Sequence, residues 1–385
     1  MRWSGRSTGR IGPIWLGALA VTVVVALVGG GCGSRSGLGL WWEDGAGGAG
    51  AASNGAGGPA EQCAAVGEEC AAEEDCCDAV CTDGACRAPP SPCVDDESPV
   101  LLATGLSDPY ALGGNATSLF MGELAAARPL LRIPKAGGSA EVLIDAVSFV
   151  DHLLVREGTV FFSEEAAVSA VPVKGGPKKV LANASGPAGI DVTAGYVYFA
   201  DYEAGQLVRI DRQTLETKVL GSQALPGIHR VAQIENANLV YFSSSTNGVR
   251  RYHLDDGWFD SIDIDTPPAR AVRLWGEMVY FTVPSIAHVY RVGVLSVDTE
   301  LVADLSPLGV YPEALETDGT SLYLTLETGT DSGLIVRVPI EGGEVEIIAD
   351  AQGPRPSALV VDDTCVYWTE RATGSLYRAR KDPSP

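Results

Sequence analysis

The 385-residue sequence is poor in basic side chains. It has 27 Lys and Arg against 49 Asp and Glu, which gives a formal net charge of −22. A nucleic-acid-binding surface needs a basic footprint that neutralises phosphates, so this composition argues against a nucleic-acid partner. An acidic balance instead favours solubility and cationic partners, and it says nothing about the fold.

The sequence also lacks the motifs of several enzyme classes. It has no G-x-S-x-G, no phosphate-binding loop and no H-E-x-x-H. Asp263 and Asp265 alternate and would share one face of a strand, but two carboxylates are too few to specify Ca²⁺. No catalytic residue can be assigned, and no cofactor or metal is predicted.

The N-terminus has the features of an export signal. Arg2, Arg6 and Arg10 form a basic start, residues 11–28 are apolar, and three glycines precede Cys32. The Cys after the small residues resembles the signal of bacterial lipoproteins, in which that Cys is acylated and becomes the first mature residue. Cys32 is therefore the predicted lipidation site. There are two alternatives: cleavage of an ordinary secretory signal without lipidation, or an uncleaved membrane anchor formed by the 18 apolar residues.

By this resemblance the protein is exported and anchored by lipid in the bacterial cell envelope, at the outer membrane or the cell surface. Residues 32–62 are rich in Gly, Ala and Ser, which is typical of a flexible tether. The pair Trp41–Trp42 interrupts this segment. Near an acylated Cys it could lie at the membrane interface, or it could be incidental.

Nine cysteines are an odd number for an exported protein. If Cys32 carries lipid, eight remain, and six of them fall within 24 residues: Cys63, Cys70, Cys76, Cys77, Cys81 and Cys86. A segment this short cannot bury a core, so we expect disulfides to hold it. Metal binding is the rival interpretation, but the segment has no His and its compartment should be oxidising. From the residues alone, about 15 connectivities are possible.

The spacing C-x6-C-x5-C-C-x3-C-x4-C resembles small cystine-knot modules. That resemblance implies the pairs Cys63–Cys77, Cys70–Cys81 and Cys76–Cys86. Cys93 and Cys365 then remain, and they would pair by elimination.

A hydrophobic–aromatic–hydrophobic triplet recurs seven times along the rest of the chain. Its central aromatics lie 37 to 44 residues apart, at Phe120, Phe161, Tyr198, Tyr241, Tyr280, Tyr323 and Tyr367. Each triplet is followed by a short apolar strand that usually has a central Arg, as in Leu131-Arg132-Ile133, and then by another apolar strand. A further strand precedes each triplet and often starts Pro-x-Ala, as at Pro109, Pro312 and Pro356.

Four strands per roughly 40 residues are the signature of β-propeller blades. We therefore predict an all-β fold, a seven-bladed propeller of four-stranded antiparallel blades. Over residues 97–381 the triplets and the Arg-containing strands resemble the YWTD and NHL-like propeller families. Tyr367-Trp368-Thr369-Glu370 comes closest to the YWTD string, with Glu in place of the final Asp. YWTD propellers have six blades, whereas this chain has seven triplets.

The ring should be closed by the N-terminal strand. The last blade ends one strand short, while "SPVLLATG" (98–105) looks like an outer strand without a blade of its own. Cys93 precedes that strand and Cys365 begins the last triplet strand, so a Cys93–Cys365 bond would lock the closure. The predicted organisation is a signal peptide (1–31), a tether (32–62), a disulfide-rich module (63–93) and the propeller (97–385).

Two histidines are candidates for the central channel. His152 should lie on the innermost strand of the second blade and His229 near that of the fourth, where propeller enzymes often place catalytic groups. A surface or core position is the alternative for both. Asp191, Asp201 and Asp362 recur near blade turns and are expected to cap them.

Two functions fit these features. The first is a non-enzymatic, monomeric surface lipoprotein whose propeller is a rigid binding scaffold for a protein, glycan or other extracytoplasmic ligand. The second is a propeller enzyme that resembles streptogramin lyases, with His152 or His229 as the base. The lyase would need a His pair and metal-binding acids at one channel mouth, so the binding scaffold is the main hypothesis. Fold alone does not decide between them.

Cleavage before Cys32 and acylation of its side chain are the first testable consequences. Mass spectrometry of the N-terminal peptide from the native host should find a lipid-modified Cys32 as the first residue. An unmodified Cys32, or a mature chain that starts elsewhere, would contradict the lipoprotein interpretation.

Overall fold

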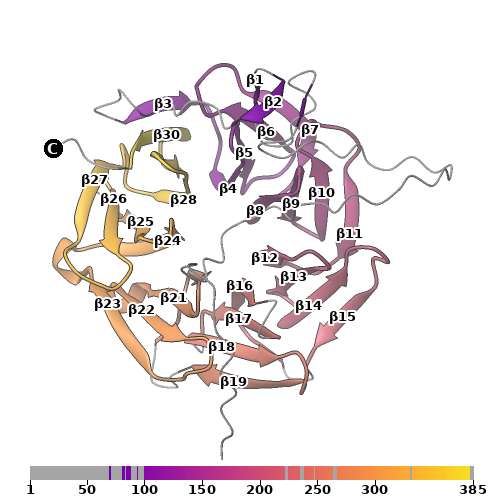
Figure 1. The fold of residues 1–385 in the computed structure, drawn as a ribbon, viewed down its shortest axis with the longest axis vertical. Helices are drawn as coiled ribbons and strands as arrows, with labels where there is room; N and C mark the ends of the chain where they lie inside the picture. Colours follow the sequence, from indigo (N-terminus) through magenta and orange to yellow (C-terminus); the bar gives the residue numbers. More distant parts are fainter. Residues whose placement is uncertain are drawn as a thin grey trace, which may run out of the picture. The chain divides into compact units, whose positions relative to one another are not determined.

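The computed structural model describes residues 69–70, 80–82, 84–87, 93, 99–221, 224–234, 238–246, 248–262, 267–329 and 332–381. Within them, seven four-stranded antiparallel sheets are arranged around a central channel (Figure 1). This confirms the predicted all-β, seven-bladed propeller. The described residues include no helix long and apolar enough to cross a bilayer. The predictions on Cys32, on the segments 1–31 and 32–62, and on Asp263 and Asp265 lie outside the described residues.

Each blade runs outward from the channel, and its second strand is buried at nearly every position. The innermost strands are β4 (Pro109–Gly114), β8 (His152–Arg156), β12 (Pro187–Val192), β16 (Ile228–Ile234), β20 (Val272–Trp275), β24 (Tyr311–Thr317) and β28 (Pro356–Val361). The second strands are β5 (Ser118–Glu123), β9 (Thr159–Glu164), β13 (Tyr196–Asp201), β17 (Leu239–Ser244), β21 (Met278–Val283), β25 (Ser321–Glu327) and β29 (Cys365–Glu370).

The outer strands complete the blades, which are numbered from the one that begins with β4. The third strands are β6 (Arg128–Pro134), β10 (Ala167–Pro172), β14 (Gln206–Asp211), β18 (Gly248–His253), β22 (His288–Gly293), β26 (Leu334–Pro339) and β30 (Ser375–Arg380). The outermost strands are β7 (Glu141–Val147), β11 (Lys179–Asn183), β15 (Thr217–Leu220), β19 (Trp258–Ile262), β23 (Thr299–Asp304), β27 (Glu346–Asp350) and β3 (Val100–Ala103).

The triplet aromatics form the packing between blades. Phe120, Tyr241 and Tyr367 are completely buried, and the other four central aromatics are at most 4% exposed. An aromatic side chain buries 150–250 Å², so one such residue per blade supplies much of the apolar contact with the neighbouring blade. The predicted burial of these seven rings is confirmed.

The Arg in the middle of the third strand links one blade to the next. Arg132 is opposite Glu141 on β7 and binds its carboxylate, while its Nη1 donates to the Val173 carbonyl of the second blade at 3.3 Å. Arg251 and Arg378 make the equivalent bond to the carbonyl of the blade that follows theirs. The recurring Arg is therefore a connector between blades.

The ring closes as the sequence predicts. Strand β3 pairs antiparallel with β30, with Val100 opposite Arg378, and so completes the seventh blade, β28-β29-β30-β3. Cys93 and Cys365 form a disulfide across this closure, with Cα atoms 5.7 Å apart and 272 positions between them. Both sulfur-bearing residues are fully buried.

The N-terminal module is described only in part. Strands β1 (Val80–Thr82) and β2 (Ala85–Arg87) pair antiparallel, and Cys81 lies opposite Cys86 in this hairpin. Cys70 and Cys86 each take part in a disulfide bond. The predicted pairings of the module, with the side chains of Cys63, Cys76, Cys77 and Cys81, lie outside the described residues.

Removing the closing disulfide should loosen both ends of the propeller. In the chain-entropy model, a bond that closes so long a loop contributes about 4–5 kcal/mol, an upper figure because strain is ignored. In the double variant Cys93→Ser, Cys365→Ser we expect faster amide exchange in residues 99–105 and 357–381, measured by mass spectrometry. Residues 187–220 of the third blade serve as the internal control. Equal acceleration in that blade would contradict a local role for the bond.

Candidate binding site at the mouth of the central channel

Five of the seven innermost strands are irregular near their first residues. In β4, β12, β16, β24 and β28 the pairing with the second strand shifts register within the first residues. Such a bulge leaves residues unpaired and re-aims side chains. A hydroxyl of the second strand binds the freed amide: Thr369 Oγ1 accepts from Ala358 N, and Ser243 Oγ accepts from Arg230 N, both at 3.0 Å.

In all seven blades, one residue near the start of the innermost strand lies at an equivalent position at the channel mouth. We call this set the entry ring. From the first blade to the seventh it consists of Tyr110, Asp151, Ala188, His229, Arg270, Glu313 and Ser357. Seven different residue types occupy the seven equivalent positions. Two residues further along each strand the side chain is always Leu, Ile or Val, as required for packing.

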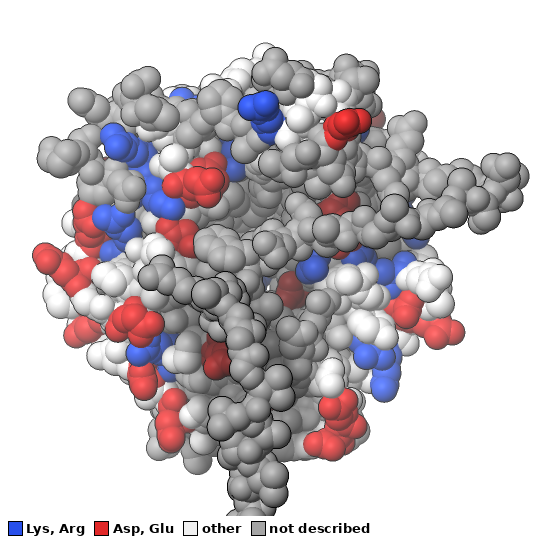
Figure 2. All heavy atoms as spheres, viewed as in Figure 1, with Lys and Arg blue, Asp and Glu red and all other residues white. Residues whose placement is uncertain are grey.

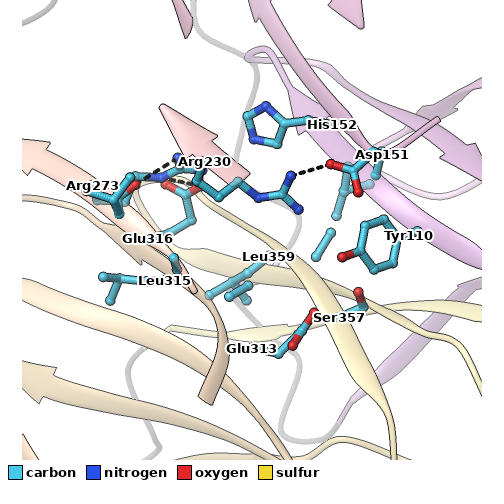
Figure 3. A pocket seen from close by; sticks show the side chains of 16 residues that line it. Tyr110, Asp151, His152, Arg230, Arg273, Glu313, Leu315, Glu316, Ser357 and Leu359 are labelled. Carbon is cyan, nitrogen blue, oxygen red and sulfur yellow. Dashed lines mark hydrogen bonds and ion pairs between the residues drawn. The ribbon is translucent and has the colours of Figure 1, made fainter. Parts of the chain in front are cut away.

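An ion pair crosses the mouth over the third blade. Arg230 of β16 donates from Nη1 to Oδ2 of Asp151, which precedes β8 (Figure 3). The third blade leaves room because it has Ala188 in the entry ring and Gly189 next to it. A Cβ atom at Gly189 would lie 2.4 Å from the His229 carbonyl oxygen, so glycine is needed for the close approach of β12 and β16.

A second arginine joins three blades on the opposite side of the ring. Arg270 Nη2 donates to a Glu313 carboxylate oxygen and to the Tyr110 hydroxyl, the latter at 2.8 Å. Tyr110 is 160 positions away in the sequence. Arg371 stacks on the other side of the same tyrosine, 4.7 Å from the ring centroid, and pairs with Asp108. The tyrosine ring is thereby fixed in place.

The pairs favour the charged forms of Asp151 and Arg270. Burial alone would raise the pKa of Asp151, but the Arg230 guanidinium outweighs it and the pKa is lowered. For Arg270 burial acts against the charge, yet the neighbouring Tyr110 and Glu313 raise its pKa. Burial raises the pKa of the Tyr110 hydroxyl, which therefore stays protonated at neutral pH.

The two predicted channel histidines are both neutral. His152 begins β8 and its Nδ1 accepts the amide of Ile190 at 3.0 Å; burial and then Arg230 lower its pKa well below the usual value. His229 lies in β16, and burial followed by the charge of Arg230 lowers its pKa to about 3. Its Nδ1 is buried with no hydrogen-bond partner among the described residues, and its ring lies edge-on to Tyr202, 6.2 Å between centroids.

The cavity at the centre of the channel is small. It has a volume of about 50 Å³ and is lined by residues of six blades. Figure 3 shows Tyr110, Glu313 and Ser357 around the same space. Deeper in the channel, Arg273 of β20 binds Glu316 of β24. A volume of this size holds one or two waters or a single small functional group.

The sequence predictions for this region are partly right. Asp201 caps the turn before β12 by accepting the Ser185 and Gly186 amides, and Asp362 caps the turn before β29. Asp191 is a correction: its carboxylate accepts the Gln233 amide at 2.7 Å and so joins β12 to β16. Burial raises its pKa.

The arginines and acids of the mouth were not predicted, because they belong to no enzyme motif and have no regular spacing in the sequence. One signal was present, however. The Pro-x-Ala starts mark equivalent positions, and the middle residue of three of them is a member of the entry ring: Tyr110, Glu313 and Ser357. Comparing that residue between blades would have found the ring. Within the described residues, no group of three or more His, Cys, Asp or Glu could hold a metal ion.

No protein-family model matches the chain, and no curated protein is similar to it in sequence. Solved structures share the fold. A catalytically inactive variant of virginiamycin B lyase from Staphylococcus aureus, solved with quinupristin, has a TM-score of 0.60 at 16% identity over 73% of this chain and 97% of that one. The designed protein Ika8 has a TM-score of 0.54 at 14% identity, and the match covers 74% of this chain and 100% of that one. The extracellular domain of a hybrid two-component system from B. thetaiotaomicron has a TM-score of 0.56 at 11% identity, and the match covers 72% of this chain and 41% of that one. At these identities the likeness concerns the fold alone.

The ion pair that crosses the mouth should be important for stability. Removing one partner of a mostly buried pair leaves the other charge uncompensated, at a cost of about 3 kcal/mol or more. We expect Arg230→Met to lower the free energy of unfolding by that amount in urea titrations at neutral pH. Glu141→Gln is the control: Glu141 is half exposed, its replacement leaves the Arg132 bond to the Val173 carbonyl in place, and such exposed pairs contribute about 1 kcal/mol at most.

The same experiment has a pH dependence with a defined sign. The folded-state pKa of Asp151 is lowered, so the stabilisation is present above the unfolded pKa of about 4 and is lost as the pH falls through the folded value. The difference between wild type and Arg230→Met should therefore shrink in acid. A difference that is constant with pH would show that Asp151 is not the group involved.

Proposed function

We propose that the protein is a non-enzymatic exported lipoprotein whose propeller is a rigid binding scaffold. Its ligand, a protein or another extracytoplasmic molecule, binds at the channel mouth formed by the entry ring. The observation that carries this proposal is the variety of the ring: seven residue types at seven equivalent positions of an otherwise repetitive framework.

Folding does not require that variety. The framework residues around the entry ring recur from blade to blade, as in Ala111-Leu112, Ala314-Leu315 and Ala358-Leu359. Such residues satisfy the packing of each blade, so the intervening position is free to differ. Polar residues that differ between blades and share one concave site are typical of a ligand-binding surface.

The geometry supports binding rather than catalysis. A general base needs a free lone pair near the proton that it removes, but the Nδ1 lone pair of His152 is occupied by the Ile190 amide. The carboxylates of Asp151 and Glu313 are held by arginines. His229 is the one histidine of the ring that could act as a base, and no carboxylate among the described residues hydrogen-bonds its ring.

A lyase remains the second candidate. Two observations favour it: the shared fold with virginiamycin B lyase and the presence of two histidines beside the channel. In this alternative His229 would be the base, since its Nδ1 has no partner among the described residues. The substrate would have to lie above the channel, because a cavity of about 50 Å³ is too small for a drug-sized molecule.

The export and anchoring parts of the proposal rest on the N-terminal sequence. The basic start, the apolar run and Cys32 support secretion with a lipid on that cysteine. The closing disulfide supports the same compartment, since such bonds persist in oxidising surroundings.

Photocrosslinking in the native cell envelope can test the site. A benzophenone amino acid in place of Tyr202, which lies beside His229 and is 44% exposed, should form a crosslinked product. The same residue in place of Val142, 57% exposed on the outermost strand β7, is the matched control and should not. Equal products from both positions, or none from Tyr202, would contradict binding at the mouth.

Incubation with quinupristin separates the two candidate functions. The scaffold proposal expects the compound to remain intact by mass spectrometry. Ring opening that is abolished by His229→Ala would instead establish the lyase alternative.

A further inference from the structure

Most hydrogen-bond acceptors of the cavity are occupied, whereas several of its donors are not. Its charged acceptors are the carboxylates of Asp151, Glu313 and Glu316, and each already binds an arginine: Arg230, Arg270 and Arg273. Several of its donors, in contrast, have no acceptor among the described residues. An uneven balance of this kind indicates the chemistry of the group that would complete it.

Two hydroxyl groups are such donors. The Tyr110 oxygen accepts a hydrogen bond from Arg270, so its own proton is available to a ligand. Ser357 is only 3% exposed and lines the cavity, and its hydroxyl has no partner among the described residues. The Ser357 carbonyl is fixed by Thr325 Oγ1 at 2.8 Å, which holds the backbone that carries this hydroxyl in place.

Nitrogen donors add to them. Because Nδ1 of neutral His152 accepts the Ile190 amide, the imidazole proton is on Nε2. Arg270 uses Nη2 for Glu313 and Tyr110, and the described residues offer no acceptor to its Nη1 and Nε. Its side chain is one-third exposed, so those N–H groups can be reached from the mouth.

We propose that the cavity binds a carboxylate group of the ligand. The inference rests on the proposed binding function of the mouth and names its chemistry. A carboxylate is a small, planar group with acceptor oxygens only. It suits a cavity of about 50 Å³ that is lined by Tyr110, His152 and Ser357, with Arg270 bound to the Tyr110 hydroxyl beside it. The three protein carboxylates that line the cavity, Asp151, Glu313 and Glu316, make a singly charged group more compatible than a dianionic phosphate.

The overall charge of the chain does not favour an anion, so recognition has to be local. The net charge is −22, yet acidic and basic side chains of the described residues are interspersed on the face shown in Figure 2. Salt at physiological strength screens exposed charges beyond about 8 Å. Hydrogen bonds inside the cavity act over shorter distances and are unaffected by distant charges.

A carboxylate could come from a peptide C-terminus or from an acidic sugar, and calorimetry can distinguish them. The probes are N-acetylglycine with its amide, and glucuronate with glucose. We expect one carboxylate probe of the two to bind, and its neutral counterpart to bind at least about tenfold more weakly, since hydrogen bonds to a charged group are worth 1.5–3 kcal/mol. An amide or glucose that binds as well as the acid would overturn the inference, as would the failure of both acids at millimolar concentration.

Variants assign the site. Tyr110→Phe and Ser357→Ala each remove one hydroxyl donor without a change of charge, and each should weaken the bound acid by about tenfold. Tyr311→Phe is the matched control, because Tyr311 is 56% exposed and does not line the cavity. Thermal unfolding of each variant confirms that it is folded. Unchanged affinity in both folded variants would overturn the inference, while position-dependent crosslinking from Tyr202 would leave the proposed function standing.

Discussion

Closure of the ring is the constraint on which the rest of the structure depends. A propeller blade is a four-stranded sheet that can bury its two faces only between neighbours, and an open ring would leave one blade uncovered at each end. Here the chain closes the ring with its N-terminal strand β3 on β30 and fixes the joint with Cys93 and Cys365. The seven innermost strands then have fixed positions around the channel, so seven side chains from distant parts of the sequence can form one site.

Several hydrogen bonds between blades end on main-chain carbonyls and do not involve the side chains of the channel. The Thr369 and Ser243 hydroxyls accept amides of their own innermost strands, and Ser243 Oγ also donates to the Arg270 carbonyl of the next blade at 2.7 Å. Arg132 likewise binds a carbonyl in the blade after it. Such bonds are independent of which side chain stands in the entry ring. A scaffold of this kind can keep its geometry while the residues at its mouth change.

Most of the fold could be predicted because its signals are local and repeated. The triplets at Tyr241 and Tyr323, the recurring Arg and the spare N-terminal strand each occupy a few neighbouring residues. The site could not be predicted in the same way, because its contacts join residues 79 positions apart at Asp151 and Arg230 and 160 apart at Tyr110 and Arg270. These pairs have no spacing rule, and they are defined by the closed ring and by the bulges that turn the side chains inward.

The composition of the channel is better explained by recognition than by stability. Replacing a buried ion pair with packed apolar residues is often neutral or stabilising, and the channel can accept apolar residues: Leu154 and Val360 stand at the position that Arg273 and Glu316 occupy in the fifth and sixth blades. A channel selected for stability alone could therefore have been apolar throughout. Instead, its charged side chains are paired, while its hydroxyl groups have protons that no described residue accepts. The pairs hold these donors in place before a ligand arrives, and this lowers the entropic cost of ordering them on binding.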